Sequence, residues 1–230
     1  MIINPAQPNS LEWLQARCGV VTASEFDNIV TGDFKARTGE MPKSYLARKF
    51  AEKWLGSPLA GFQSVDMDIG TILEGEVIPF YELETGQTVT RIGLLTNDEG
   101  TIGCSPDGLL GEDSGIEIKC PRPETHVKYL LNGTLPKEYA PQVHGAMFVT
   151  GRPRWVFMSY CRRFPPFILT VERDEEIIQM LYDSIGDFVA DVELAYLSLC
   201  KLNDGPPART PMLQYVPKPK PTLHELEIIP

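Results

Sequence analysis

The sequence predicts an α/β fold in which helices flank a central mixed β-sheet. Short apolar segments with a period of two alternate with longer segments whose apolar residues recur every three to four positions. A chain with 43% hydrophobic residues can also bury one good core. Seven prolines fall within the last 26 residues and prevent regular structure there. We therefore expect a single domain over residues 1–204 and an extended, proline-rich tail over residues 205–230.

The N-terminal segment predicts two short helices. Ser10 can cap the first of them. The sequence Thr22-Ala-Ser-Glu25 matches a capping box, so the second helix should begin at Thr22. Free N–H groups at that helix end, the hydroxyls of Thr22 and Ser24, and the guanidinium of Arg17 together suggest a phosphate pocket. The alternative is that Thr22 only caps the helix and Arg17 lies on the surface.

A polar, basic loop over residues 32–43 follows, and it is longer than a simple connection requires. Ser44 can cap the next helix. The segment Asp68–Glu84 predicts another helix, in which Glu74 faces inward and requires a charged or metal partner. Pro79 lies inside that pattern and should kink the helix or begin a new segment.

Val89–Thr96 predicts a strand, and a turn leads from it into the segment Thr101–Pro121. Within that segment, Ile-Glu-Ile-Lys alternates with a period of two, so Glu117 and Lys119 share one face while the isoleucines point into a core. The turn-type residues 111–115 make the preceding apolar stretch an antiparallel partner. We therefore expect Asp107 to lie across from Glu117.

Two carboxylates and an ammonium group converge in this hairpin. Mg²⁺ prefers hard oxygen ligands and needs only one or two protein carboxylates when substrate phosphate completes its shell. A nearby lysine can orient or activate the attacking water. The pattern resembles the PD-(D/E)xK nuclease signature, here Pro106-Asp107 followed by Glu117-x-Lys119. On spacing alone, a solvated strand face is the alternative.

The C-terminal half predicts further helices and strands. Pro141 suits the first turn of a helix, and Gln142 at its start could face the site or could be polar helix surface. A long helix should begin after Asp174. The remaining expected elements are a helix over Glu124–Leu131 and a meander of the two strands Trp155–Tyr160 and Phe167–Glu172.

The net charge of −10 does not exclude a nucleic-acid partner, because binding follows the local electrostatic field more than the total. Residues 35–53 hold six basic side chains and two acids, a balance of +4 (6 − 2), whereas residues 172–193 hold eight acids and one arginine. We expect the basic stretch to follow a DNA backbone, unless it is only a solvated helix face. Its candidate DNA contacts are Lys35, Arg37, Lys43 and Lys49.

Composition excludes several classes of site. The five cysteines are odd in number and show no paired spacing, which indicates reduced thiols rather than a disulfide framework or a zinc site. The three histidines are scattered, which also disfavours zinc. We find no charged-then-apolar leader and no run of 18 apolar residues, so we expect neither secretion nor a membrane partner.

Five blocks of sequence occur in order over residues 13–172. They are Trp13-x-x-x-Arg17-x-Gly19-Val-Val-Thr22-Ala-Ser24, Gly70-x-x-x-Glu74, Cys104-Ser105-Pro-Asp107-Gly-Leu, Glu117-Ile-Lys119-Cys-Pro121 and Ala140-Pro-Gln142-Val143. These blocks resemble the lambda exonuclease (YqaJ-type viral recombinase) family, which implies a restriction-endonuclease-like core. The departures from the family pattern are His144, Pro79 and Pro141.

The resemblance also implies a role for each matched residue. Asp107, Glu117 and the backbone carbonyl of Ile118 resemble the metal ligands, with Glu74 as a further metal-site acid. Lys119 and Gln142 resemble the residues that hold the attacking water. The residues that resemble the 5′-phosphate pocket are Arg17, Thr22, Ser24 and Ser105. The residues that fall near the family's apolar, duplex-opening side chains are Met41 and Met67.

Taken together, the resemblance implies a 5′→3′ exonuclease that degrades one strand of linear double-stranded DNA with a 5′-phosphate. The 3′ overhangs would serve phage-type recombination by strand annealing. The resemblance further implies two Mg²⁺ ions per site, replaceable by Mn²⁺, a homotrimeric ring, and a single-strand annealing protein as partner. We expect a cytoplasmic location in a bacterial host, with a phage or prophage gene. The alternatives are a restriction-type endonuclease and a non-catalytic scaffold that binds DNA ends.

Overall fold

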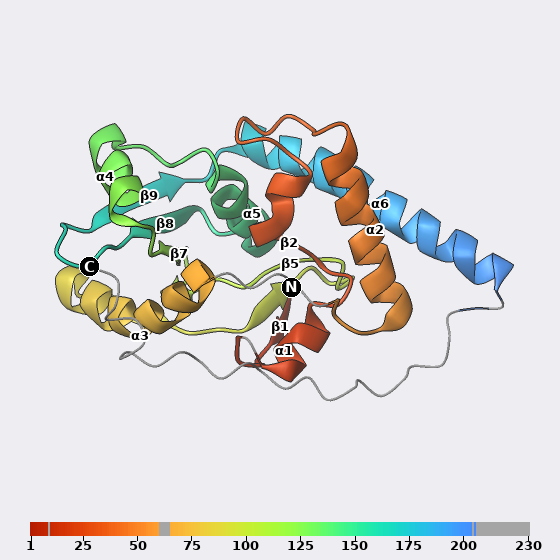
Figure 1. The fold of residues 1–230 in the computed structure, drawn as a ribbon, viewed down its shortest axis with the longest axis horizontal. Coiled ribbons are helices and arrows are strands. Elements are labelled where there is room, and N and C mark those ends of the chain that lie inside the picture. The colour runs from red at the N-terminus through yellow and green to blue at the C-terminus, as the bar shows by residue number, and fades with distance from the viewer. Residues whose placement is uncertain (9, 60–64, 204, 206–230) are drawn as a thin grey trace.

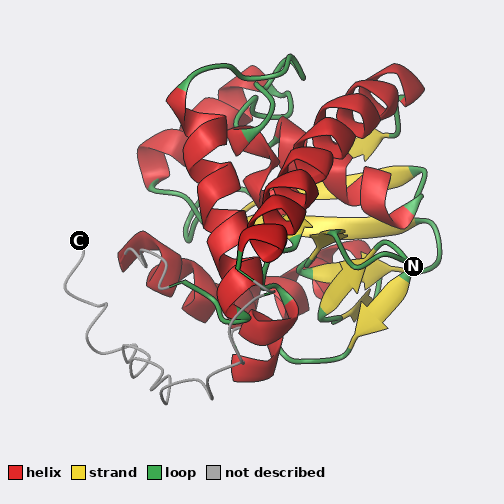
Figure 2. Cartoon of the chain, turned by 90° about the vertical axis from the view of Figure 1, so that its right-hand side faces the viewer, coloured by secondary structure: helices red, strands yellow, loops and turns green. Residues whose placement is uncertain are grey.

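The structure, a computed structural model, describes residues 1–8, 10–59, 65–203 and 205, and for residues 65–74 it describes the backbone only. Helices surround strands that form two mixed sheets within these residues (Figure 1). Figure 2 shows most of the helices gathered to one side of the strands. The predicted α/β class is confirmed, but the single central sheet is divided in two. The predicted tail lies outside the described residues, and its boundary stays a prediction.

The larger sheet carries the predicted nuclease hairpin. Strand β7 pairs with β6 in an antiparallel ladder and with β8 in a parallel one. Gly108 lies opposite Ile116, so the residue before β6, Asp107, lies opposite Glu117 as predicted. The order is β3-β6-β7-β8-β9. Its strands are β3 (Val89–Thr90), β6 (Gly108–Leu110), β7 (Ser114–Lys119), β8 (Arg154–Ser159) and β9 (Phe167–Glu172).

The smaller sheet has the order β1-β4-β5-β2. The expectation of one strand over residues 89–96 is wrong, because the start of that segment forms a strand of the larger sheet and its end forms a strand of the smaller sheet. The chain changes sheet at Gly93, where a Cβ atom would lie 2.3 Å from the carbonyl oxygen of Asn4. It changes sheet again over residues 105–107. The strands are β1 (Ile2–Asn4), β2 (Val21–Thr22), β4 (Leu94–Thr96) and β5 (Ile102–Cys104).

Helix α5 is the central helix and packs against strands of both sheets. Helix α6 runs beside α2 and projects past the body of the domain (Figure 1). One apolar face of α6 is buried, and it includes Leu181 and Ile185, which are fully enclosed. The helices are α1 (Leu11–Ala16), α2 (Glu40–Leu55), α3 (Val65–Thr85), α4 (Pro123–Asn132), α5 (Ala140–Thr150) and α6 (Glu175–Leu202).

Two of the predicted helix caps are confirmed, and two are wrong. Ser10 accepts a hydrogen bond from the backbone of Trp13, and Asp174 accepts two at the start of α6. Thr22 does not cap, because side chains occupy its hydroxyl, and η1 (Ala23–Asn28) is a 3₁₀-helix. Helix α2 begins at Glu40, which places Ser44 inside it.

Pro79 neither ends nor divides α3, which is assigned as one helix through that position. None of the five cysteines, all of which lie in the described part of the chain, is in a disulfide. A search of the described helices finds none long and apolar enough to span a membrane.

Candidate active site

Three of the predicted catalytic side chains meet at the ends of β6 and β7. Asp107 Oδ2 accepts a hydrogen bond from the backbone N–H of Ile118 at 2.6 Å. Lys119 Nζ donates to Glu117 Oε1, also at 2.6 Å. The Glu117 side chain is 6% exposed and that of Lys119 is 25% exposed. Glu117 is therefore a nearly buried carboxylate whose charge is balanced within the site.

Helix α5 adds a second donor to the same carboxylate oxygen. Gln142, in the first turn of that helix, donates from Nε2 to Glu117 Oε1 at 2.6 Å. The residue that caps the helix, Tyr139, places its ring centroid 5.0 Å from Lys119 Nζ. Lys119 is thus held between a carboxylate and an aromatic face, an arrangement that favours a charged ammonium group.

The charge of Lys119 reflects the acids around it. Burial alone would lower the pKa of Lys119, but the charges of Glu117 and Asp107 outweigh burial and raise that pKa above its usual value. Lys119 is therefore protonated at neutral pH. In that form it can donate a hydrogen bond or stabilise negative charge.

The same acids suit a hard divalent cation. Two carboxylates from neighbouring strands and the carbonyl of Ile118 supply oxygen ligands only, which is the donor set that Mg²⁺ prefers. Among side chains in the described residues, no group of three His, Cys, Asp or Glu gathers at one point. The third predicted acid, Glu74, lies in the part of α3 whose side chains are outside the described residues.

A second cluster forms around Arg17, at the C-cap of α1. Its Nη2 donates to Thr22 Oγ1 at 2.9 Å and to Ser24 Oγ at 3.3 Å. The guanidinium carbon lies 4.4 Å from the ring centroid of Trp13. Burial lowers the pKa of Arg17, although nearby Glu25 opposes this shift. A cation that has lost part of its hydration gains more from an incoming anion than an exposed one does.

Ser105 joins this cluster through Trp13. The indole Nε1 of Trp13 donates to Ser105 Oγ at 3.0 Å, and Ser105 Oγ donates to the carbonyl of Gly93 at 3.1 Å. Ser105 belongs to the connection between the two sheets, two residues before Asp107. The four residues predicted for the phosphate pocket are thus brought together, with Trp13 at their centre.

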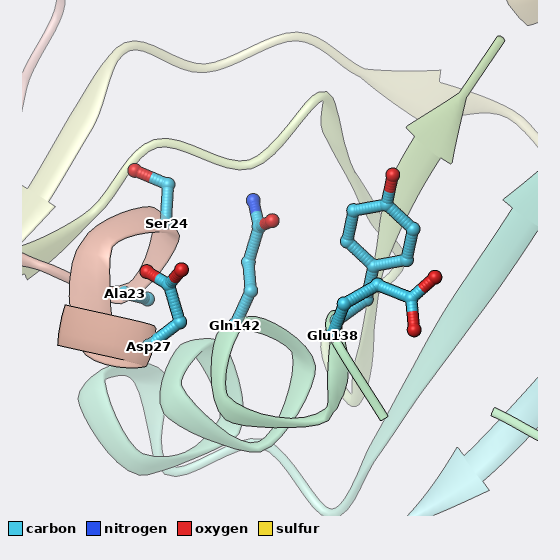
Figure 3. A pocket seen from close by; sticks show the side chains of 6 residues that line it. Ala23, Ser24, Asp27, Glu138 and Gln142 are labelled. Carbon is cyan, nitrogen blue, oxygen red and sulfur yellow. The ribbon is translucent and has the colours of Figure 1, made fainter. Parts of the chain in front are cut away.

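One cavity borders both clusters, each through a single residue. It has a volume of about 230 Å³ and holds Ser24 of the arginine cluster and Gln142 of the carboxylate cluster in its lining. In Figure 3, Ser24 and Asp27 rise from η1 on one side, Glu138 stands on the other, and Gln142 lies between them. The full lining is Ala23, Ser24, Asp27, Glu138, Tyr139 and Gln142.

Comparison with known proteins agrees with this geometry. Residues 12–153 match the model of the YqaJ-like viral recombinase domain, which is more than half of the chain. The chain belongs to the YqaJ-like viral recombinase family. The resemblance inferred from the sequence blocks is therefore confirmed. A search of curated proteins gives no match.

Solved exonucleases share the fold of this recombinase-family chain. The structure of LHK-Exo in complex with dAMP is 32% identical, with a TM-score of 0.76, over 85% of this chain and 98% of that one. An alkaline exonuclease (LHK-Exo) from Laribacter hongkongensis is 31% identical, with a TM-score of 0.71, over 84% and 100%. A phage related exonuclease from Haemophilus somnus, 15% identical over 80% and 96% with a TM-score of 0.58, supports the fold alone.

The predicted DNA contacts of this family member separate into different environments. Lys35, Met41 and Lys43 are exposed, as a contact residue requires. Arg37 donates from Nε to backbone carbonyls, among them that of Val30 at 3.1 Å, so part of its guanidinium braces a loop. The side chain of Met67 lies outside the described residues.

Lys49 is not on the surface, and its predicted role as a DNA contact is wrong for that reason. Its residue exposure is 3%, and Nζ lies 3.0 Å from both Glu25 Oε2 and Glu52 Oε2. Glu52 also accepts from the backbone N–H of Gly19 at 3.2 Å. The helical spacing of α2 turns Tyr45, Lys49 and Glu52 inward.

Replacing Lys49 with Met should destabilise the recombinase-family domain by about 3 kcal/mol, because two buried carboxylates lose their shared partner. The slope of DNA affinity against salt concentration should not change. The matched control is Lys43→Met on the exposed side of α2, which should leave stability within roughly 0.5 kcal/mol. Urea unfolding and DNA binding at several salt concentrations measure the two effects. An unfolding midpoint for Lys49→Met equal to wild type would contradict this assignment.

Two site features were not predicted from the sequence of this family member. Tyr139 reaches Lys119 only because α5 packs over the end of β7, and Glu25 was interpreted as half of a capping box. Neither Tyr139 nor Glu25 stands in a sequence pattern that indicates its role in the site. His144, a departure from the family pattern, is buried with its ring edge-on to Phe34, so it belongs to the core and not to the site.

Proposed function

We propose that the protein is a Mg²⁺-dependent 5′→3′ exonuclease that degrades one strand of linear double-stranded DNA and leaves a 3′ overhang. The observation that carries the proposal is a cavity lined by Ser24 of the arginine–hydroxyl cluster and by Gln142, which contacts Glu117 of the carboxylate–lysine cluster. One cluster suits a metal ion and a scissile phosphate, and the other suits a terminal phosphate. A nucleotide bound by both would be cut at a fixed distance from its 5′ end.

In this proposal, Asp107, Glu117 and the carbonyl of Ile118 would hold the metal ions, with Mn²⁺ as a substitute for Mg²⁺. Two bound ions would supply Lewis-acid stabilisation and an activated water. Gln142 would orient that water through its amide group. Lys119, which is protonated, would donate to the water or to a phosphate oxygen and offset the charge that develops there.

Arg17, Ser24 and Ser105 would bind the terminal 5′-phosphate. Arginine offers several N–H donors to phosphate oxygens, and a charge-assisted hydrogen bond is stronger than a neutral one. Each cleavage leaves a new 5′-phosphate on the shortened strand. The same cluster would therefore bind the product end of one step as the substrate of the next.

Family membership supports three further parts of the proposal. The active form would be a homotrimeric ring, its partner would be a single-strand annealing protein, and it would act in the cytoplasm of a bacterial host on behalf of a phage or prophage. A mass measurement in solution tests the first part. A monomer at working concentration would contradict it.

The function itself is tested with linear duplexes that differ only at their 5′ ends. We expect faster release of nucleotides from 5′-phosphate than from 5′-hydroxyl ends, dependence on Mg²⁺, and no cleavage of covalently closed circles. Arg17→Ala should reduce the preference for the phosphate about tenfold or more, because a charge-assisted contact is lost. Cleavage of closed circles would favour a restriction-type endonuclease. End binding without Mg²⁺ and without nucleotide release would favour a scaffold.

A further inference from the structure

A network of charged side chains lies behind the arginine cluster, and the proposed reaction does not use it. Thr22 is the link between the two. Thr22 is fully buried. Its Oγ1 accepts a hydrogen bond from Arg17 Nη2 at 2.9 Å and donates one to Glu25 Oε2 at 3.2 Å. Thr22 therefore connects the half-buried cation of Arg17 to the carboxylate of Glu25.

Glu25 is held by three side chains of α2. Lys49 Nζ lies 3.0 Å from Glu25 Oε2, Tyr45 donates its hydroxyl to the same oxygen at 3.2 Å, and Arg48 pairs with the other oxygen. Burial alone would raise the pKa of Glu25, but Lys49 and Arg48 outweigh burial and lower that pKa below its usual value. An ionised carboxylate only accepts hydrogen bonds, so Glu25 fixes the direction of each bond it makes.

The direction of the Thr22 bond limits what Thr22 can do. A hydroxyl group has one proton. A contact of 3.4 Å joins Thr22 Oγ1 to Ser24 Oγ, but the carboxylate of Glu25 is both nearer and the stronger acceptor. With its proton directed to Glu25 and an oxygen lone pair directed to Arg17, Thr22 has no proton to donate to a phosphate.

Ser24 lies in a different environment. It is exposed, it accepts from Arg17, and it lines the cavity that leads to Gln142 (Figure 3). Its own hydroxyl proton can be directed into that cavity. Of the two hydroxyls next to Arg17, only Ser24 has the access that a ligand of a terminal phosphate requires.

We propose that Glu25 is a positioning residue that fixes Arg17, a proposed ligand of the 5′-phosphate, through the hydroxyl of Thr22. This inference rests on the proposed function. It revises the role that the family resemblance implied for Thr22, from a phosphate ligand to a relay. Within the network, Arg17, Arg48 and Lys49 supply three cations against the two carboxylates Glu25 and Glu52.

The test is the ratio of kcat/KM on 5′-phosphate ends to that on 5′-hydroxyl ends. Thr22→Val, which keeps the shape and removes the hydroxyl, and Glu25→Gln should each lower this ratio roughly tenfold. Since both act on the same relay, the double variant should lose about as much as one single variant rather than the roughly hundredfold product. Thr22→Ser should restore the ratio. Glu12→Gln, the same charge change at an exposed position on α1, should leave it unchanged.

Competition by inorganic phosphate gives an independent reading of the same cluster. Its inhibition constant should rise in Thr22→Val and Glu25→Gln and should stay at the wild-type value in Glu12→Gln. Ser24→Ala should lower the end-preference ratio further in the Glu25→Gln background, because a direct ligand is lost there as well.

Several results would overturn the inference. Losses that multiply in the Thr22→Val/Glu25→Gln double variant would make Thr22 a direct ligand, and equal losses on both kinds of end would make Glu25 merely structural. If Glu25→Gln does not fold, Thr22→Val and Thr22→Ser carry the test, and an unchanged ratio in Thr22→Val refutes the relay. A wild-type enzyme without any preference for 5′-phosphate would instead refute the proposed function.

Discussion

Lys119→Ala should lower the rate of nucleotide release from linear duplex about 10³-fold at saturating Mg²⁺, an effect of the size seen when a positioned charge donor is removed from a reaction centre. Lys119 is protonated and lies against Glu117, so its loss removes the cation nearest to the expected position of the scissile phosphate. Single-turnover cleavage of a 5′-phosphorylated duplex measures the chemical step. Binding of the DNA end should change much less than the rate.

A matched control separates chemistry from general charge. Lys128→Ala removes an exposed lysine from α4 and should leave the rate within about twofold, because surface substitutions away from a site have small effects. Glu117→Gln should be as damaging as Lys119→Ala, since it removes a carboxylate from the proposed metal site. A Lys119→Ala enzyme that retains more than a tenth of wild-type activity would rule out the proposed mechanism.

Trp155→Ala should destabilise the domain by about 3–5 kcal/mol, the usual cost of removing a large aromatic side chain from a core. Trp155 on β8 is fully buried, and its ring lies over the neighbouring strand at Gly115. A Cβ atom at Gly115 would come within 2.3 Å of that ring, so the glycine and the indole fit one another. Urea denaturation followed by far-UV circular dichroism measures the loss.

Trp155→Phe is the control for that substitution. It keeps a ring above Gly115 and removes Nε1, a buried donor for which the described residues supply no partner. Its cost should be below about 1.5 kcal/mol, because the retained volume limits the cavity and no hydrogen bond is lost. If Trp155→Phe is destabilised as much as Trp155→Ala, the packing of a ring over Gly115 is not how Trp155 stabilises the domain.

The pairing of β6 with β7 could be predicted from the sequence because the relevant signals are local. The alternation of Glu117 and Lys119 fixes their shared face, and the turn before Ser114 fixes the partner strand. The antiparallel register of the two strands then places Asp107 opposite Glu117. The same reasoning located the start of α5, where a proline marks the first turn and brings Gln142 to Glu117.

The sequence could not reveal where the chain passes from one sheet to the other. Residues 89–96 look like one strand because alternation says nothing about which neighbours a strand will find. The change at Gly93 depends on the carbonyls of Asn4 and Ala6, almost ninety positions away. In the same way, the capping-box pattern at Thr22 was locally valid. The hydroxyl that would have capped the helix instead bonds to Arg17 and Glu25.

Charge patterning also has a limit that Lys49 illustrates. The basic residues of α2 look equivalent in the sequence, but the packing of α2 against α6 and η1 turns one face inward. Lys49 lies on that face between two acids, whereas Lys43 lies in solvent. A count of charged residues predicts a local electrostatic field, but the packing of the helix decides which of those charges reach the surface and contribute to it.

The connection between the sheets has a consequence for the length of each catalytic step. Ser105 belongs to the arginine cluster and Asp107 to the carboxylate cluster, and two residues of backbone span at most roughly 7 Å. Under the proposed function, this short connection limits how far the anchored strand terminus can lie from the bond to be broken. Side-chain evolution around the cavity could alter speed or affinity, but the increment of digestion would remain built into the polypeptide itself.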